Sequence, residues 1–214
     1  MTTATRTTSA KPKPKPAKRP SKKPRGDSRE RMIEATAELL QKQGYAGTGL
    51  AEILATSGAP RGSLYFHFPG GKEQLACEAL AASGREWIAR FTGITEAAKT
   101  PAEALDRACA MLGDELERSG WEIGCPIATV ALEAAHTSEA IQQTCAAHFA
   151  DLEALVTMQL ERAGVPAGVA PIAATFAISA VEGSLLLARA HRSRTPLERV
   201  AMALRAQMSM MIGG

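Results

Sequence analysis

Apolar residues recur every three or four positions through most of the 214-residue chain. This spacing predicts amphipathic helices rather than strands. Three short helices are predicted first, over residues 27–44, 48–57 and 60–68. Longer ones follow over residues 72–91, 100–119, 125–135, 138–163, 168–191 and 196–212. We therefore expect an all-α protein, with a small three-helix N-terminal domain and a larger helical C-terminal domain.

Charge is distributed unevenly along the chain. Residues 1–25 hold nine basic residues and no acidic one, which leaves 16 basic against 22 acidic residues in the rest. The repeated Lys-Pro pairs of residues 11–16 cannot form a helix, so residues 1–26 are expected to be a disordered basic arm. Such an arm suits a nucleic-acid tether, although a solubilising tail has the same composition. The remaining boundaries are placed at residues 27–75 and 76–214.

Several classes of protein find no support in the sequence. The longest apolar runs are interrupted before they reach the eighteen or so residues that span a bilayer, and the N-terminus lacks an apolar signal region. A cytoplasmic protein without a membrane segment is therefore expected. The four cysteines are isolated and show no C-x-x-C spacing, so we expect buried thiols and neither a metal site nor a cofactor.

The most informative stretch lies between residues 57 and 68. Gly58 suits a sharp turn and Pro60 suits a first helical position, so a short helix follows a preceding one as in a helix-turn-helix. Leu64 and Phe68 can pack on a core, whereas the opposite side is suited to a DNA major groove. A plain surface helix is the alternative. The side chains expected to face bases are Arg61, Gly62, Ser63 and Phe66. Those expected to hold phosphates are Thr48, Tyr65, His67 and Lys72.

Over residues 28–75 the chain resembles the DNA-binding domain of TetR-family repressors. The matching residues, in the family's order and spacing, are Gly44, Tyr45, Thr48, Ile53, Gly58, Gly62, Ser63, Leu64, Tyr65, His67, Phe68, Lys72 and Glu73. The sequence departs from the commonest pattern of the family at two places, which are a proline at position 60 and the Pro-Gly-Gly turn of residues 69–71. These departures, together with Gly-Cys-Pro at residues 124–126, resemble the branch of lincomycin-resistance repressors.

The resemblance implies a homodimer that joins through its last two helices, binds a palindromic operator and is released by a small molecule. Small residues on the penultimate helix fit a dimer seam, although they also fit an internal core. The seam candidates are Ala177, Ala180, Val181, Ser184 and Ala188. The candidates for an effector pocket are Trp87, Phe91, Met111, Trp121, Phe149, Met158 and Phe176, any of which can equally be core. Their chemistry suggests an uncharged or weakly charged, planar, hydrophobic effector.

Two other classes of function are weighed against a repressor. Glu133 and His136 have the Glu-x-x-His spacing of di-iron bundles, but the required second copy is missing from the sequence. No nucleophile and base in a catalytic spacing and no phosphate loop is seen either, so an enzyme is not expected. A sequence-nonspecific architectural DNA binder that uses the basic arm remains an alternative.

Overall fold

A computed structural model describes residues 27–212, which form nine α-helices and contain no strand. The all-α prediction is confirmed, whereas the basic arm lies outside the described residues. The helices are α1 (Ser28–Gly47), α2 (Leu50–Ser57), α3 (Arg61–His67), α4 (Gly71–Ala97), α5 (Pro101–Arg118), α6 (Pro126–Ala134), α7 (Glu139–Arg162), α8 (Ala170–His191) and α9 (Thr195–Ile212).

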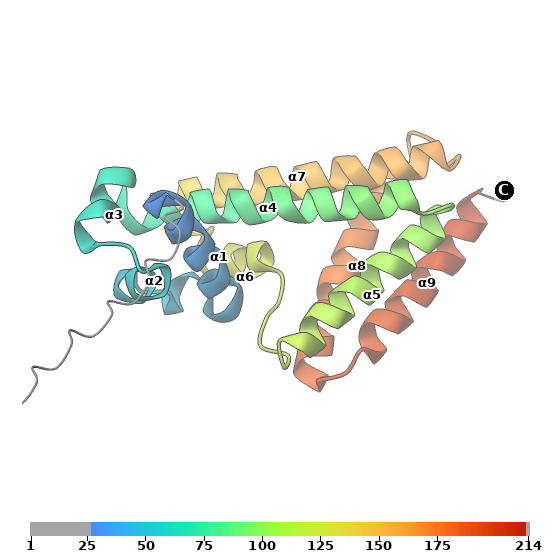
Figure 1. Ribbon diagram of the computed structural model, residues 1–214. Helices are drawn as coiled ribbons and strands as arrows, with labels where there is room; N and C mark the ends of the chain where they lie inside the picture. The colour runs from blue at the N-terminus through green and yellow to red at the C-terminus, as the bar shows by residue number, and fades with distance from the viewer. Residues whose placement is uncertain (1–26, 213–214) are drawn as a thin grey trace, which may run out of the picture.

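The first three helices form a small unit at one end of the molecule (Figure 1). Asp27 caps α1 by accepting a hydrogen bond from the backbone N–H of Arg29. Gly58 ends α2 in the left-handed region at φ 61°, as the sequence predicted, and turns the chain into α3. Pro60 is the N-cap of α3 rather than its first helical residue. The apolar residues of this unit form a core of Met32, Leu39, Ile53, Ala59, Leu64, Phe68 and Leu75.

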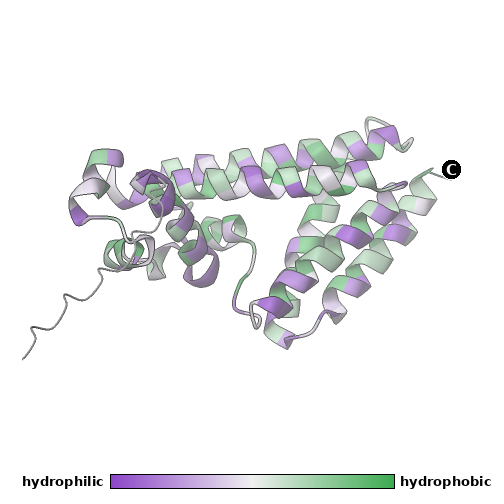
Figure 2. Ribbon diagram, viewed as in Figure 1, coloured by the Kyte–Doolittle hydropathy of each residue, from purple (hydrophilic) through white to green (hydrophobic). Residues whose placement is uncertain are grey.

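The long helix α4 joins this unit to the rest of the molecule. Its 27 residues span roughly 40 Å at about 1.5 Å per residue, and α7 lies beside it over much of that length (Figure 1). Helices α5, α8 and α9 pack together at the far end, where Arg205 of α9 pairs with Asp106 of α5. Hydrophobic and hydrophilic positions alternate along the long helices (Figure 2), as amphipathic packing requires.

Helix α1 contributes to two cores at once. Leu39 is buried in the core of the N-terminal unit, while the next residue, Leu40, is fully buried in a second core. This second core lies where α1 meets α4, α6 and α7, and it includes Leu80, Val130 and Ile141. The two parts of the molecule therefore share α1 and α4, so neither can move without disturbing a packed interior.

The end of α1 is sharply kinked at Gly44, where the helix was predicted to stop. Gly44 has φ 70° and ψ −173°, and the chain resumes helical geometry as far as Gly47. The carboxylate of Glu133, on α6, accepts a hydrogen bond from the backbone N–H of Ala46 at 3.1 Å. A Cβ on Gly44 would lie 2.1 Å from the same carboxylate, so a larger residue here would displace Glu133 from the Ala46 N–H.

Helix α8 is long and apolar enough, by length and composition alone, to cross a membrane. A helix in the interior of a soluble protein can meet the same criteria. In this structure α8 packs between α7 and α9, and its Ala173, Ala174, Ser184, Leu185 and Ala188 are buried against them or against α5. The opposite face of α8 is apolar and exposed, so it is available for contact with another chain.

Two glycine substitutions can separate the effect of backbone strain on stability from the effect of the contact with α6. Gly58→Ala places alanine in the left-handed helical region at about 1–2 kcal/mol, and its Cβ meets nothing within 4 Å. Gly44→Ala places alanine at φ 70° and ψ −173°, in a region that only glycine adopts readily, at about 1–3 kcal/mol. Gly44→Ala must also displace Glu133 from the Ala46 N–H, which adds about 1 kcal/mol. Urea denaturation should show Gly44→Ala as the more destabilising change. In a Glu133→Ala background the difference between the two substitutions should shrink by the roughly 1 kcal/mol of the Glu133 contact, and an unchanged difference there would contradict the contact.

Candidate functional site

Helix α3 presents an unusual surface for a seven-residue helix. Leu64 is buried against the core, while the opposite face carries Tyr65, which is 63% exposed, and Phe66, which is 81% exposed. Arg61 and Gly62 are exposed on the first turn of the same helix. An exposed aromatic ring, a guanidinium group and a bare stretch of backbone fit a groove that offers both hydrogen-bond acceptors and thymine methyl groups.

Gly62 and Ser63 define how closely another molecule can approach α3. A Cβ on Gly62 would meet nothing within 4 Å, so the glycine is not required by packing inside the protein. The hydroxyl of Ser63 donates to the carbonyl of Pro60 at 2.6 Å, which directs its proton away from solvent and leaves its lone pairs as acceptors. Ser63 is thus placed to accept a hydrogen bond from a base rather than to donate one.

Two of the residues predicted to hold phosphates make contacts inside the protein. Thr48 is fully buried, and its hydroxyl donates to the carbonyl of Gly44 at 2.7 Å. The N-cap of α2 is the next residue, Gly49. His67 is half-buried and its Nε2 lies 3.1 Å from the hydroxyl of Ser28, so the ring joins α3 to the start of α1. Both side chains stabilise the unit that holds α3. The Thr48 hydroxyl has no exposed surface for a phosphate, whereas a phosphate contact through His67 stays a prediction.

Lys72, at the start of α4, also has a structural contact. Its ammonium donates to the carbonyl of Tyr45 at 2.7 Å and lies 4.2 Å from the centre of the Tyr45 ring. Burial lowers the pKa of Lys72, and the negative charge of Glu133 acts in the opposite direction. An ammonium group has three donors, so a contact to Tyr45 leaves two for a phosphate. Tyr65, whose ring lies near Gly71, remains the most exposed of the four predicted phosphate contacts.

The C-terminal half encloses an apolar cavity of about 200 Å³ between α4, α5, α7, α8 and α9. Two of the seven pocket candidates, Trp87 and Phe91 of α4, line it, with their ring centres 5.8 Å apart. Gly124 and Cys125, at the start of α6, form part of the wall, and so does Gln41 of α1, whose amide donates to the carbonyl of Gly124 at 3.2 Å. The cavity therefore touches the N-terminal unit directly.

The other five pocket candidates do not line this cavity, which corrects the prediction. Met111 and Trp121 pack against the core formed by α5, α8 and α9, and Phe149 packs against the core around α6. Met158 and Phe176 are exposed at the surface. Helical periodicity placed these side chains on apolar faces, but most of those faces are filled by neighbouring helices.

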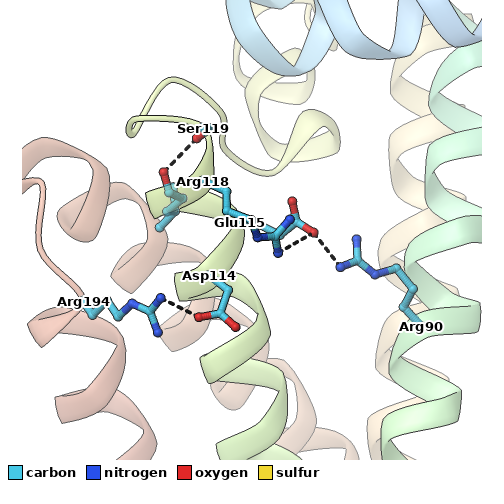
Figure 3. Close-up of polar contacts among 7 residues, drawn as sticks. Arg90, Asp114, Glu115, Arg118, Ser119 and Arg194 are labelled. Carbon is cyan, nitrogen blue, oxygen red and sulfur yellow. Dashed lines mark hydrogen bonds and ion pairs between the residues drawn. The ribbon is translucent and has the colours of Figure 1, made fainter.

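The wall of the cavity contains one carboxylate that is paired. Glu115 of α5 accepts a hydrogen bond from Arg90 of α4 at 2.7 Å and lies 3.3 Å from Arg118 (Figure 3). Burial acts to raise the pKa of Glu115, but the two guanidinium groups together lower it. Arg90 also lies over the ring of Trp87 at 4.4 Å, so this cation is held from two sides. In the same view Arg194 pairs with Asp114 and fastens the start of α9 to α5.

The outward face of α8 and α9 is apolar and has no partner within the described chain. Ile172, Phe176, Leu186 and Leu187 of α8 are at least half exposed, as is Met202 of α9. The predicted seam residues lie elsewhere. Ser184 and Ala188 are buried, Ala177 and Val181 line the cavity, and Ala180 is half-buried. The surface of α8 that is open to a partner thus carries large apolar side chains, together with small exposed residues such as Ser179 and Gly183.

No cluster of three or more His, Cys, Asp or Glu residues that could hold a metal ion occurs within residues 27–212. Glu133, from the Glu-x-x-His spacing, is bonded to the backbone of Ala46 instead. Burial raises the pKa of Cys109 and of Cys145 to about 11, and it raises that of Cys125 further. These thiols are protonated at neutral pH and are poor nucleophiles.

Comparison with known proteins gives a consistent result. Residues 32–79 match the family model described as bacterial regulatory proteins, tetR family. Residues 101–203 match the model described as transcriptional regulator LmrA/YxaF-like, C-terminal domain. The HTH-type transcriptional regulator LmrA of Bacillus subtilis is 34% identical over 179 residues, which cover 84% of this chain and 95% of the relative. An HTH-type transcriptional regulator of Mycobacterium tuberculosis is 36% identical over 182 residues, covering 83% and 92%.

Solved structures agree with the fold. A TetR transcriptional regulator from Legionella pneumophila superposes with a TM-score of 0.77 at 23% identity, over 86% of this chain and 99% of that one. A TetR transcriptional regulator from Chloroflexus aurantiacus superposes with a TM-score of 0.73 at 27% identity, over 85% and 94%.

The open space at Gly62 makes a prediction about DNA contact. Gly62→Ala should leave the thermal midpoint unchanged or raise it, because alanine favours a helix and its Cβ meets nothing in the free protein. It should weaken DNA binding by about tenfold or more, since the loss of one base contact is worth about 1–3 kcal/mol. Gly93→Ala, in an exposed part of α4 with equally open space, is the matched control and should leave DNA binding unchanged. Equal affinity of the two variants would show that the backbone of α3 does not approach DNA closely.

Proposed function

The chain belongs to the TetR family of bacterial transcriptional regulators, in the group with an LmrA/YxaF-like C-terminal domain, and from this we propose that it is a ligand-released repressor of a palindromic operator. Members of this family bind DNA and act as dimers. The proposal places the protein in the cytoplasm on chromosomal DNA, with α3 as the helix that reads the operator.

The observation that carries the DNA-reading role is the exposed face of α3. Arg61 and Phe66 project from a helix whose other face is fixed by Leu64 in the core, so the reading face has one orientation. We assign Arg61, Gly62, Ser63 and Phe66 to bases, and Tyr65 and Lys72 to phosphates. Ser63 is assigned as an acceptor because its proton is bonded to Pro60.

The outward face of α8 and α9 supports the dimer. A contiguous apolar surface of this kind is costly to leave in water and is typical of a protein–protein interface. A two-fold dimer uses the same surface on both chains, so the large side chains of Phe176, Leu186 and Leu187 would pack against their own copies or each other. Two recognition helices then read two half-sites, which must be about 34–36 Å apart.

Release by a ligand is supported by the path from the cavity to α3. The start of α6 forms part of the cavity wall at Gly124 and Cys125, and its far end holds the kink of α1 through Glu133. Helix α6 is nine residues long, or roughly 13 Å at about 1.5 Å per residue. A ligand that displaces α6 or α4 would therefore shift the kink that leads into α2 and α3. Near-complete release needs the ligand to favour the non-binding conformer by about 10⁴-fold.

The proposed function is tested by selecting genomic fragments that the full-length protein binds at physiological salt. A repressor should enrich a sequence with inverted half-sites and should prefer it to random DNA by roughly 10³-fold or more. Enrichment of an unpaired half-site would contradict the two-fold dimer. If no sequence is enriched although random DNA is bound, the chain is an architectural DNA binder instead.

The role of α6 is tested at Glu133. Glu133→Ala removes the hydrogen bond to the Ala46 N–H and leaves the kink of α1 free to vary, so α3 is held less firmly. Operator affinity should fall by up to about fivefold, the factor that corresponds to the hydrogen bond of about 1 kcal/mol that holds the kink. Glu96→Ala, at an exposed position on α4, is the control. Fluorescence anisotropy with labelled operator measures both, and an unchanged affinity for Glu133→Ala would contradict the proposed path.

A further inference from the structure

The cavity wall contains a second carboxylate, Glu182 of α8, whose surroundings differ from those of Glu115. The charged or titratable side chains among the lining residues are Glu115, Glu182 and His148, besides two thiols, and no lysine or arginine among the described residues lines the cavity. An anionic ligand would find no cationic partner in this wall. Burial lowers the pKa of His148, so this histidine is neutral at pH 7 and adds no positive charge.

The negative charge of Glu115 is already compensated by two arginines. Its carboxylate is shared between Arg90 and Arg118, both within ion-pair distance (Figure 3). Glu182 takes part in none of the ion pairs found among residues 27–212. Arg189, two turns further along α8, lies beside Gly124 instead. Of the two carboxylates in the cavity wall, Glu115 is therefore paired with arginines and Glu182 is not.

An unpaired carboxylate in an apolar wall is unfavourable unless something supplies the missing charge or proton. Burial raises the pKa of Glu182, and a hydrogen bond with the Cys125 thiol offsets this only in part. The remaining lining side chains near it are apolar, among them Ile178, Val181 and Leu185 of the same helix. Within the described chain, no positively charged group compensates Glu182.

We propose that the effector of this cavity is an amphipathic cation, with an apolar body that packs on Trp87 and Phe91 and a protonated amine that donates to the carboxylate of Glu182. This inference rests on the proposed function, since it specifies the ligand of the same cavity. It narrows the sequence-based expectation of an uncharged or weakly charged molecule to one that carries a single positive charge.

The space available agrees with such a ligand. An apolar cavity of about 150 Å³ holds benzene, and this cavity measures about 200 Å³. The ring faces of Trp87 and Phe91 offer additional attraction to a cation that lies within about 6 Å, although Arg90 already covers one side of Trp87. Glu182 therefore supplies the main charge for recognition and the aromatic pair supplies the apolar contact.

The test uses three probes that share one body and differ in charge, namely 4-butylbenzylamine, 4-butylbenzyl alcohol and 4-butylbenzoate. Each is titrated by calorimetry at pH 7 into the full-length protein, the Glu182→Gln variant and the Glu153→Gln variant. Glu153 accepts a hydrogen bond from Thr175 on the protein surface and lies outside the cavity, so it is the control. Fluorescence anisotropy with labelled operator is run alongside, with and without each probe.

The unmodified protein and Glu153→Gln should bind the amine about tenfold more tightly than the alcohol, and the alcohol more tightly than the benzoate. Glu182→Gln should lose the preference for the amine while binding the alcohol within about twofold of the unmodified protein, and this retained binding shows that the cavity is intact. Tightest binding of the benzoate, or an amine preference that survives in Glu182→Gln, would overturn the inference. Glu182→Gln that binds neither amine nor alcohol would also overturn it, because Glu182 would then shape the cavity and not select charge.

The two proposals fail in different ways. If the amine binds through Glu182 but operator affinity does not change, the charge preference stands and ligand-controlled release is wrong. If the alcohol or the benzoate releases the operator as well as the amine does, release stands and the inference about charge is wrong. If none of the three binds, both the effector role of the cavity and its charge preference are rejected for ligands of this size.

Discussion

The sharing of α1 between two cores governs how this molecule is organised. Leu39 and Leu40 are adjacent in sequence, yet one is buried with α2 and α3 and the other with α4, α6 and α7. Close-packed interiors do not deform continuously, so a helix with residues in both must keep one position relative to each. The orientation of α3 toward DNA is consequently set by the packing of the C-terminal half. A change in the packing of the C-terminal half can reach α3 only through α1 and α4.

Polar contacts at the end of α1 strengthen this dependence. The kink at Gly44 is held by Glu133 from α6, by Lys72 from α4 and by the buried hydroxyl of Thr48. The three contacts involve consecutive backbone groups at the kink, namely the Gly44 carbonyl, the Tyr45 carbonyl and the Ala46 N–H, so side chains from two other helices fix its geometry. Several residues that mark the family in the sequence are thus explained by the kink. Gly44, Thr48 and Lys72 stabilise the end of α1, which leads into α2 and α3.

The sequence was sufficient for the fold and for the exposed face of α3, but not for every side chain. Gly58 ends α2, and Thr100 and Ser138 cap α5 and α7 by accepting hydrogen bonds from backbone N–H groups three residues later, so these boundaries depend on local signals. The role of Thr48 depends on whether its hydroxyl bonds forward to cap a helix or backward to the carbonyl four residues earlier. That choice follows from the kink and from α6, which lies more than eighty residues away in sequence. No local pattern contains this information.

Helix α8 shows why the cavity and the dimer face were harder to predict. It is apolar on both sides, so its periodicity identifies a helix without saying which side is inside. Small residues such as Ser184 and Ala188 allow the neighbouring helices of the same chain to approach closely, whereas Phe176 and Leu186 remain outside. Glu182 lies on this helix between the two faces and reaches the cavity wall. Helix α8 therefore contributes to three features: the apolar surface suited to a second copy of the chain, the core of its own chain, and the carboxylate of Glu182 in the cavity wall. A ligand in the cavity would contact the same helix that is best placed to hold a dimer.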